Sequence, residues 1–250
     1  MKITRLLNLF IGICFVSPVA FADVTDQINK TVTLAPGSNV RISGINGRVN
    51  VETWDGNRAE INITIRASDR EAMERRPIVV EDTPNSLTIR TIADKEGGRW
   101  ERDRGWVRHE VLVKMPRNVN MKVSGVNGPV TVGEITGSIG VNGINGKVDV
   151  VHAGTASDIN GINGRTSISI ARLGEAGLKV SGINGAVEIG LPASTNADVD
   201  VSGVNGHVQS DLPISVIGEM KRGQLKGTLG AGGPRIAVSG VNGGINLKRN

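Results

Sequence analysis

The most chemically distinctive part of this 250-residue sequence is a highly charged stretch, residues 94–110, that holds two of its three Trp residues. Arg102 and Arg104 lie there between Trp100 and Trp106. Trp and Arg are enriched at binding hot spots, and a guanidinium can lie over an indole face. We therefore predict that these four residues bind a protein or glycan partner. The alternative is that the two indoles cover the end of a core while the charges stay in water.

Other residues capable of chemistry are few and scattered. His109, His152 and His207 lack partners at metal-ligand spacing, so we expect surface or turn histidines and no metal site. Asp198 and Asp200 share one face of a strand, where two carboxylates could bind a cation or act as acid and base. Such alternation is more typical of the solvent face of a strand. The sequence predicts no catalytic residue and no cofactor, so we expect a protein that is not an enzyme.

The first 22 residues have the pattern of a secretory signal. Lys2 and Arg5 precede an apolar run over 6–19, and Ala20 and Ala22 then supply the small residues at both recognition positions of the cleavage site. This order predicts cleavage after Ala22 and export to the periplasm, the cell surface or the medium. The apolar run is shorter than the ~20 residues of a spanning helix, so we expect no membrane span after cleavage. Cleavage also removes Cys14, the only cysteine, which excludes disulfides.

Charge and composition argue against a nucleic-acid partner. The formal net charge is +5, and the surplus is spread along the chain rather than gathered in basic runs. Proteins that bind single strands also need aromatic side chains for base stacking, and this chain has no Tyr and only three Phe, all in the predicted signal.

A five-residue unit, [Ser/Asn]-Gly-[Ile/Val]-Asn-Gly, occurs seven times. Its Asn residues are Asn46, Asn127, Asn145, Asn163, Asn184, Asn205 and Asn242. The steps from Asn to Asn are 81, 18, 18, 21, 21 and 37 residues. The short steps define a period of 18–21 residues, and the last step predicts two periods with one unit lost. Such spacing is typical of a repeat protein, in which these Asn are structural positions.

The residues after each unit alternate apolar and polar, as at Val130 and Val132, which predicts short strands. Two architectures fit. One is an antiparallel meander with Asn-Gly at hairpin turns. The other is a β-solenoid, or β-helix, of 18–21-residue coils with a corner of positive φ at Asn-Gly. The recurring Ile or Val favours the solenoid, because it would stack on its counterpart about 4.8 Å away while the Asn side chains form an amide ladder. A narrow Val/Ile core would leave no room for large rings.

Glycine divides the chain into two regions. Residues 121–250 hold 26 of the 34 Gly, and residues 23–120 hold seven. We predict a repeat β-solenoid over 121–250 and a more irregular β region over 23–120 that starts or caps it. The strands expected in the first region are 49–54, 59–65, 78–80, 87–92 and 107–115. Asp55-Gly56 predicts a turn between the first two, and a Ser68 cap with Glu71 predicts a short helix that ends at Pro77.

The Gly-Ile-Asn-Gly unit and the Val-rich strand after it resemble a family of bacterial secreted adhesins of unknown function, related to auto-transporter adhesin head GIN domains. The resemblance spans approximately residues 40–247 and includes a Gly-rich tail over 226–234. It implies a β-helical fold, export and a role in adhesion. It brings no catalytic or ligand residues.

These observations together predict an exported, non-enzymatic β-solenoid that serves as an adhesin-like or cell-envelope scaffold. Its partner would be a protein or glycan of the envelope or surface. A β-helix carbohydrate-active enzyme is one alternative, although it would need clustered carboxylates and aromatic sugar platforms. A periplasmic accessory of envelope-stress signalling is another.

Overall fold

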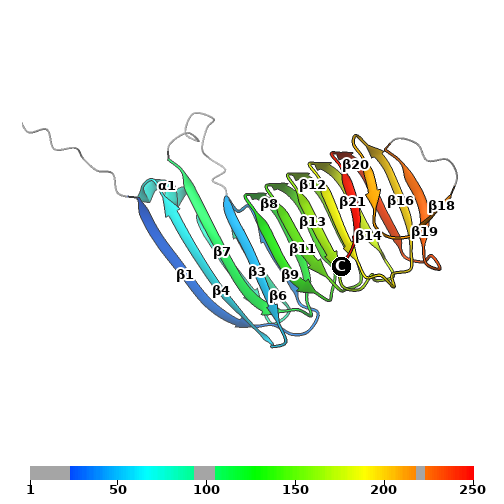
Figure 1. Ribbon diagram of the computed structural model, residues 1–250. Helices are drawn as coiled ribbons and strands as arrows, with labels where there is room; N and C mark the ends of the chain where they lie inside the picture. Colours follow the sequence, from blue (N-terminus) through cyan, green and yellow to red (C-terminus); the bar gives the residue numbers. More distant parts are fainter. Residues whose placement is uncertain (1–22, 93–104, 218–222) are drawn as a thin grey trace, which may run out of the picture.

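The computed structural model describes residues 23–92, 105–217 and 223–250. In these ranges the chain forms an all-β fold of two large mixed sheets (Figure 1). Sheet A has the strand order β1 (Val24–Thr33), β4 (Arg58–Ala67), β7 (Val107–Pro116), β3 (Gly47–Trp54), β9 (Val130–Ile135), β11 (Val148–His152), β13 (Thr166–Ile170), β15 (Val187–Leu191), β21 (Ile245–Arg249) and β17 (Val208–Ser210). Sheet B has the order β18 (Ile214–Val216), β19 (Leu225–Leu229), β16 (Ala197–Val204), β20 (Arg235–Asn242), β14 (Leu178–Asn184), β12 (Ser157–Asn163), β10 (Ile139–Asn145), β8 (Asn120–Asn127), β2 (Asn39–Ser43), β6 (Ser86–Thr91) and β5 (Ile78–Thr83).

The repeats place the chain alternately in the two sheets. β10 of sheet B is followed by β11 of sheet A and then by β12 of sheet B. β10 pairs in parallel with β8 and β12, so Val141 lies between Val123 and Ile159. β11 pairs in parallel with β9 and β13 in the same way. Equivalent residues therefore stack at one strand spacing, about 4.8 Å. This parallel pairing rules out the antiparallel meander for these strands.

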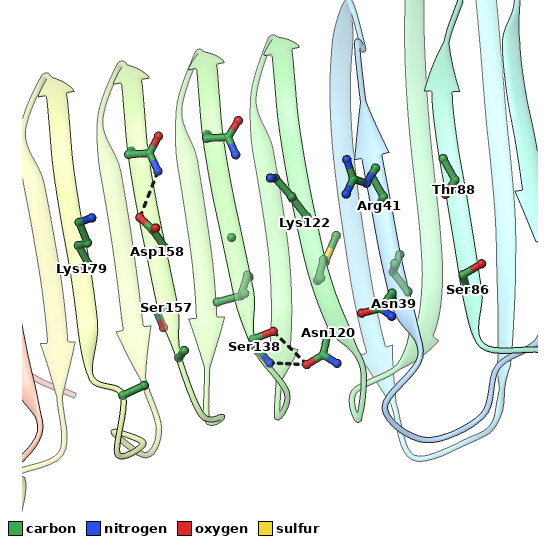
Figure 2. Close-up of a pocket in the computed structure, with 18 residues that line it drawn as sticks. Asn39, Arg41, Ser86, Thr88, Asn120, Lys122, Ser138, Ser157, Asp158 and Lys179 are labelled. Carbon is green, nitrogen blue, oxygen red and sulfur yellow. Dashed lines mark hydrogen bonds between the residues drawn. The ribbon is translucent and has the colours of Figure 1, made fainter.

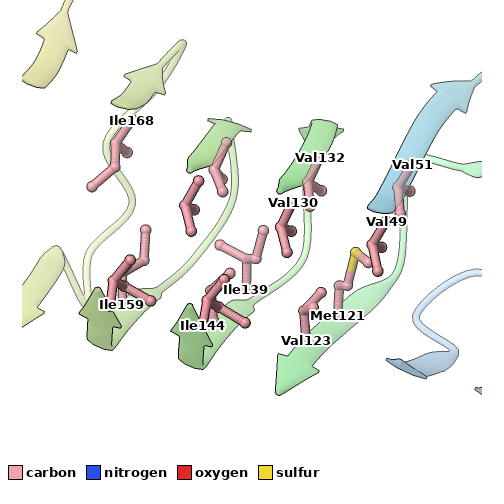
Figure 3. Close-up of a cluster of buried hydrophobic side chains, with 14 of the residues drawn as sticks. Val49, Val51, Met121, Val123, Val130, Val132, Ile139, Ile144, Ile159 and Ile168 are labelled. Atoms are coloured by element: carbon pink, nitrogen blue, oxygen red, sulfur yellow. The ribbon is translucent and has the colours of Figure 1, made fainter. Parts of the chain in front are cut away.

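The core is a narrow layer of aliphatic side chains between the two sheets (Figure 3). The apolar residue of every repeat unit is buried in it. These residues are Ile45, Val126, Ile144, Ile162, Ile183, Val204 and Val241. The alternating residues of the following strands, such as Val130 and Val132, are buried too. Each buried aliphatic side chain stabilises the fold by roughly 1.5–3 kcal/mol. The predicted stacking of the unit's Ile or Val is confirmed.

Glycine is needed at the two positions of each unit for different structural reasons. The first has a left-handed backbone, with φ of 63° at Gly182 and 62° at Gly203. It forms a kink inside the strand, and pairing resumes at the next residue. The second glycine allows close approach of two successive repeats, because a Cβ at Gly185 would lie 2.3 Å from the carbonyl oxygen of Gly164. No described Asn has a positive φ, but the glycine of the Asn-Gly pair has one in five of the seven units, from 143° at Gly47 to 156° at Gly243. The predicted positive φ at the Asn-Gly corner is therefore found at its glycine, and the first glycine of the unit is a second left-handed position.

The last two strands are inserted into the array rather than added to its end. β20 pairs in parallel with β14 on one side and β16 on the other, and β21 lies between β15 and β17 (Figure 1). The sequence predicted that the step of 37 residues is two periods with one unit lost, and this prediction is wrong. After β17 the chain passes through β18 and β19 and returns to an inner position.

A second insertion shapes the N-terminal half. β7 lies between β3 and β4, parallel to the first and antiparallel to the second. Asp55-Gly56 thus connects two strands that are not neighbours, and the turn is not a two-strand hairpin. Helix α1 (Arg70–Arg75) is capped by Asp69 and not by the predicted Ser68. The Asp69 side chain accepts a 2.7 Å hydrogen bond from the Ala72 amide, and this bond lowers the pKa of the Asp69 carboxyl.

The edge strand β1 carries charge on its inward face. Lys30 lies between Ile28 and Val32 in the inward-facing pattern, and it forms a 2.5 Å ion pair with Asp82 of β5. This pair joins the outermost strands of the two sheets. Inward charges on an edge strand disfavour pairing with another chain. They also interrupt the apolar alternation, which explains why the sequence did not indicate β1.

Both sheets continue across residue 120, since β2 pairs with β8 and β3 pairs with β9. Among the described residues, no helix is long and apolar enough to span a membrane.

Candidate binding face

A ladder of amide side chains runs along sheet B. From Asn127 on, each Asn in the ladder donates a hydrogen bond from its Nδ2 to the Oδ1 of the Asn before it, at 3.0–3.2 Å. In space the order is Asn46, Asn127, Asn145, Asn163, Asn184, Asn242 and Asn205. Asn242 stands inside the ladder because β20 is the inserted strand. These side chains bond to one another, so they link neighbouring strands of sheet B.

A second polar row lies beside the ladder on the outer face of sheet B. It is formed by the first residue of each repeat unit, paired in register from strand to strand. The members are Ser43, Ser124, Asn142, Asn160, Ser181, Ser239 and Ser202. A row of short polar side chains on parallel strands gives this face a flat, regular surface.

A groove of about 590 Å³ crosses the outer face of sheet B from β6 to β14 (Figure 2). Its central row pairs in register across neighbouring strands. In order, this row is Thr88, Arg41, Lys122, Gly140, Asp158 and Lys179. Every second residue of a strand faces outward, so the row follows from the same alternation that builds the core. These residues could not be recognised from the sequence, because they lie in different segments of the chain and become neighbours only when the strands of sheet B pair.

The groove is positively charged. Arg41 and Lys122 are direct cross-strand neighbours, both are exposed, and neither takes part in an ion pair within the described chain. Like charges in this position repel each other. Lys179 adds a third cation beyond Asp158, the only carboxylate of the lining. Asp158 Oδ1 accepts a 3.1 Å hydrogen bond from Asn160 Nδ2. The four charges leave the groove with an excess of positive charge.

Polar groups border the row of charges. The Asn120 side chain is already hydrogen-bonded to the adjacent loop, since its Oδ1 accepts hydrogen bonds of 3.0 Å from both the backbone N–H and the hydroxyl of Ser138. Asn142 lies two residues after Gly140 on β10, and its side chain has no hydrogen-bond partner in the described part of the chain. An amide of this kind can donate and accept toward a ligand.

The predicted Trp/Arg site is only partly described. Trp100, Arg102 and Arg104 lie outside the described residues. Trp106 is 40% exposed, and the Arg108 guanidinium lies 5.7 Å from its ring centroid. The backbone amide of Trp106 donates to the Ser68 hydroxyl at 3.2 Å. Trp106 precedes β7 of sheet A, whereas the groove belongs to sheet B. Binding by the Trp/Arg stretch stays a prediction.

Two of the three histidines are buried, which corrects the expectation of surface positions. His152 is 1% exposed and pairs in register with Ile135 and Ile170, so it fills an aliphatic position of the core. His109 is 4% exposed, and its Nδ1 accepts a 3.2 Å hydrogen bond from the backbone N–H of Asn46. Burial lowers the pKa of each imidazole to about 4. Both are therefore neutral near pH 7. His207 is exposed, as expected.

The Asp198 and Asp200 pair lies on the outer face of β16. Asp200 forms an ion pair with Arg235 of the inserted strand β20. In the described residues, no group of three or more His, Cys, Asp or Glu side chains is placed to hold a metal ion.

The fold is similar to that of one solved bacterial protein, and two other solved proteins align with the chain over most of its length. A candidate cell adhesion protein from Clostridium sporogenes superposes with a TM-score of 0.52 and 14% identity, over 91% of this chain and 100% of that one. Candidate adhesins from Parabacteroides merdae and Bacteroides fragilis have TM-scores of 0.33 and 0.39, at 17% and 12% identity. These cover 90% and 89% of this chain and 96% and 97% of their own. The first likeness shows a shared fold. No family model and no curated protein matches the sequence.

Proposed function

We propose that this protein is an exported, non-enzymatic β-solenoid that serves as an adhesin-like binding scaffold of the cell envelope. The alternation between two sheets with parallel, in-register pairing supports a solenoid. The signal pattern of residues 1–22 supports export. The shared fold with a candidate cell adhesion protein supports a binding role.

The observation that carries the proposal is the groove on sheet B. It contains two adjacent cations, Arg41 and Lys122, which form no ion pair with any described residue and extend outward from strands that pair in register. Parallel strands in register fix the backbone positions from which these two side chains extend, so the surface under a ligand needs no rearrangement when it binds. The groove therefore has the charge and the rigidity of a binding site.

The groove does not favour the carbohydrate-active enzyme. Glycoside hydrolysis commonly uses two carboxylates on either side of the scissile bond. Among the lining residues Asp158 is the one carboxylate, and Asn160 donates a hydrogen bond to it. The lining includes no Trp, Tyr or Phe to stack on a sugar ring. A site of this composition can hold a ligand, but it has no acid–base pair.

The proposal is tested by localisation and binding together. We expect the mature protein to begin at Asp23, to be found in the periplasm or at the surface, and to sediment with isolated envelopes of the producing cells. Mass spectrometry of the N-terminus, protease treatment of intact cells and a sedimentation assay measure these three properties. A cytoplasmic protein with an intact N-terminus would overturn export. An exported protein that stays in the supernatant would overturn the binding role.

A further inference from the structure

We infer that the sheet B groove is a site for an acidic saccharide, with Gly140 leaving space for the sugar ring and Arg41 and Lys122 holding its anionic group. This inference deepens the binding role proposed above and rests on it. The structure supports it through three independent features of the groove.

The first feature is Gly140, a position where neither the backbone conformation nor the neighbouring atoms require glycine. Gly140 is the second residue of β10 and lines the groove, and its φ lies outside the left-handed range. A Cβ added to it would meet only Lys122 Cγ, at 3.9 Å, which is an ordinary contact. The second glycines of the repeat units differ, since a Cβ at Gly164 would meet backbone at 2.3 Å. A glycine in a strand weakens it and often marks a bulge, a tight bend, or the close approach of a ligand or another backbone. Gly140 pairs in regular register with Lys122 and Asp158 and has no other backbone close to its Cβ position, so the approach of a ligand is the reason that fits.

The second feature is the pair of cations beside this glycine. Arg41 and Lys122 repel each other as long as nothing lies between them. An anion bound to both would remove that repulsion. The Arg guanidinium presents parallel N–H groups that match a carboxylate or a phosphate, and Lys adds a point charge. The anion expected here is therefore a carboxylate or phosphate carried by a larger ligand.

The third feature is the space and polarity next to the cations. Lys122 and Asp158 are two strands apart, about 10 Å, with only Gly140 between them. The Asn142 amide and the Asp158 carboxylate can hydrogen-bond to hydroxyl groups on either side of that gap. A groove of about 590 Å³ is of the size that holds small organic ligands, and it is larger than an inorganic anion requires. A sugar ring with an attached anionic group fits this arrangement.

The test is calorimetric titration of the purified mature protein with three probes. Digalacturonic acid carries carboxylates, mannose 6-phosphate carries a phosphate, and digalactose is the neutral control. We expect at least one acidic probe to bind and digalactose not to bind. The acidic probe that binds identifies the anionic group. Binding of neither acidic probe, or equal binding of digalactose, would overturn the inference.

Two groove variants and one control sharpen the test. Gly140→Val should fill the space for the ring without lowering the melting temperature, because the Cβ has room and Val suits a strand. Arg41→Gln with Lys122→Gln should remove the anion partner. Each should weaken acidic-probe binding by about tenfold or more. Ala237→Val adds bulk to the same outward row beyond the groove and should bind like the wild type.

A folded Gly140→Val protein with wild-type affinity would contradict the assignment. The proposed function has a separate outcome. If neither acidic probe binds while the protein still sediments with envelopes, the ligand assignment fails and the binding role stands.

Discussion

At the scale of single residues, glycine acts in three ways on the two sheets. The first glycine of each unit supplies a left-handed backbone, the second lets two coils approach, and Gly140 leaves an outward position empty. The sequence shows all of them as glycine. The repeated ones could be predicted as structural because they recur in every unit. The role of Gly140 needed the structure, since only the distance from its Cβ position to neighbouring atoms shows that nothing requires glycine there.

The left-handed glycine can be tested at Gly182. Gly182→Val should lower the free energy of unfolding by roughly 1–3 kcal/mol, because a β-branched residue is strained at φ 63°. Urea unfolding followed by circular dichroism measures the change. Gly140→Val is the matched control on the same sheet. Equal stability of the two variants would contradict the role of the left-handed backbone.

The amide ladder can be tested at its middle and at its end. Asn163→Ala removes the bonds to Asn145 and Asn184, so we expect a loss of about 1–3 kcal/mol for two hydrogen bonds. Asn205→Ala removes only the bond to Asn242, and its effect should be smaller. The free energy of unfolding of both variants provides the comparison. A larger loss at Asn205 would show that the ladder does not link the coils as described.

At the scale of elements, the two insertions are what the sequence could not reveal. The repeat unit predicted strands, their period and their stacked apolar residues. It did not predict the order of strands, because Val204 of β16 and Val241 of β20 occupy the same position in two copies of the unit and can pair in the same register. Which of them lies next to β14 depends on the route of the chain through β18 and β19. In the same way, β7 separates β3 and β4 although only a short turn connects those two strands.

Hydrogen exchange tests the inserted strands. The amides of β20 and β21 should exchange as slowly as those of β12 and β13, because both strands have neighbours on each side. The C-terminal strand of most folds frays earlier than the interior. Mass-spectrometric exchange resolves the peptides 235–242 and 245–249. Exchange of β20 before the edge strand β18 would contradict the inserted position.

At the scale of the whole molecule, the two buried histidines make stability depend on pH. Their imidazoles have pKa values of about 4 in the folded protein, against 6.5 ordinarily. The unfolded chain therefore takes up protons below about pH 6.5 that the folded chain takes up only near pH 4. The contribution of these two histidines to the free energy of unfolding is fully present above pH 6.5, and it is lost as the pH decreases from there toward 4. The sequence did not indicate this, because a core histidine in an aliphatic position has no distinguishing spacing.

The replacement His152→Leu isolates one of these contributions. Between pH 7 and pH 4.5 the wild type should lose about 2–3 kcal/mol more unfolding free energy than the variant, since Leu cannot bind a proton. Urea unfolding at the two pH values measures the difference. Replacing the exposed His207 by Leu is the control and should keep the wild-type dependence. Equal losses in the wild type and in His152→Leu would contradict a buried neutral imidazole.

The central claim is that the cationic groove of sheet B is the binding surface of this protein, and charge reversal tests it most directly. Arg41→Glu with Lys122→Glu reverses the groove, while Arg58→Glu with Arg66→Glu makes the same change of charge on β4 of sheet A. Sedimentation with isolated envelopes at fixed salt is the measurement. We predict that the groove variant stays in the supernatant and that the sheet A variant sediments like the wild type. Sedimentation of a folded groove variant at the wild-type level would contradict the claim.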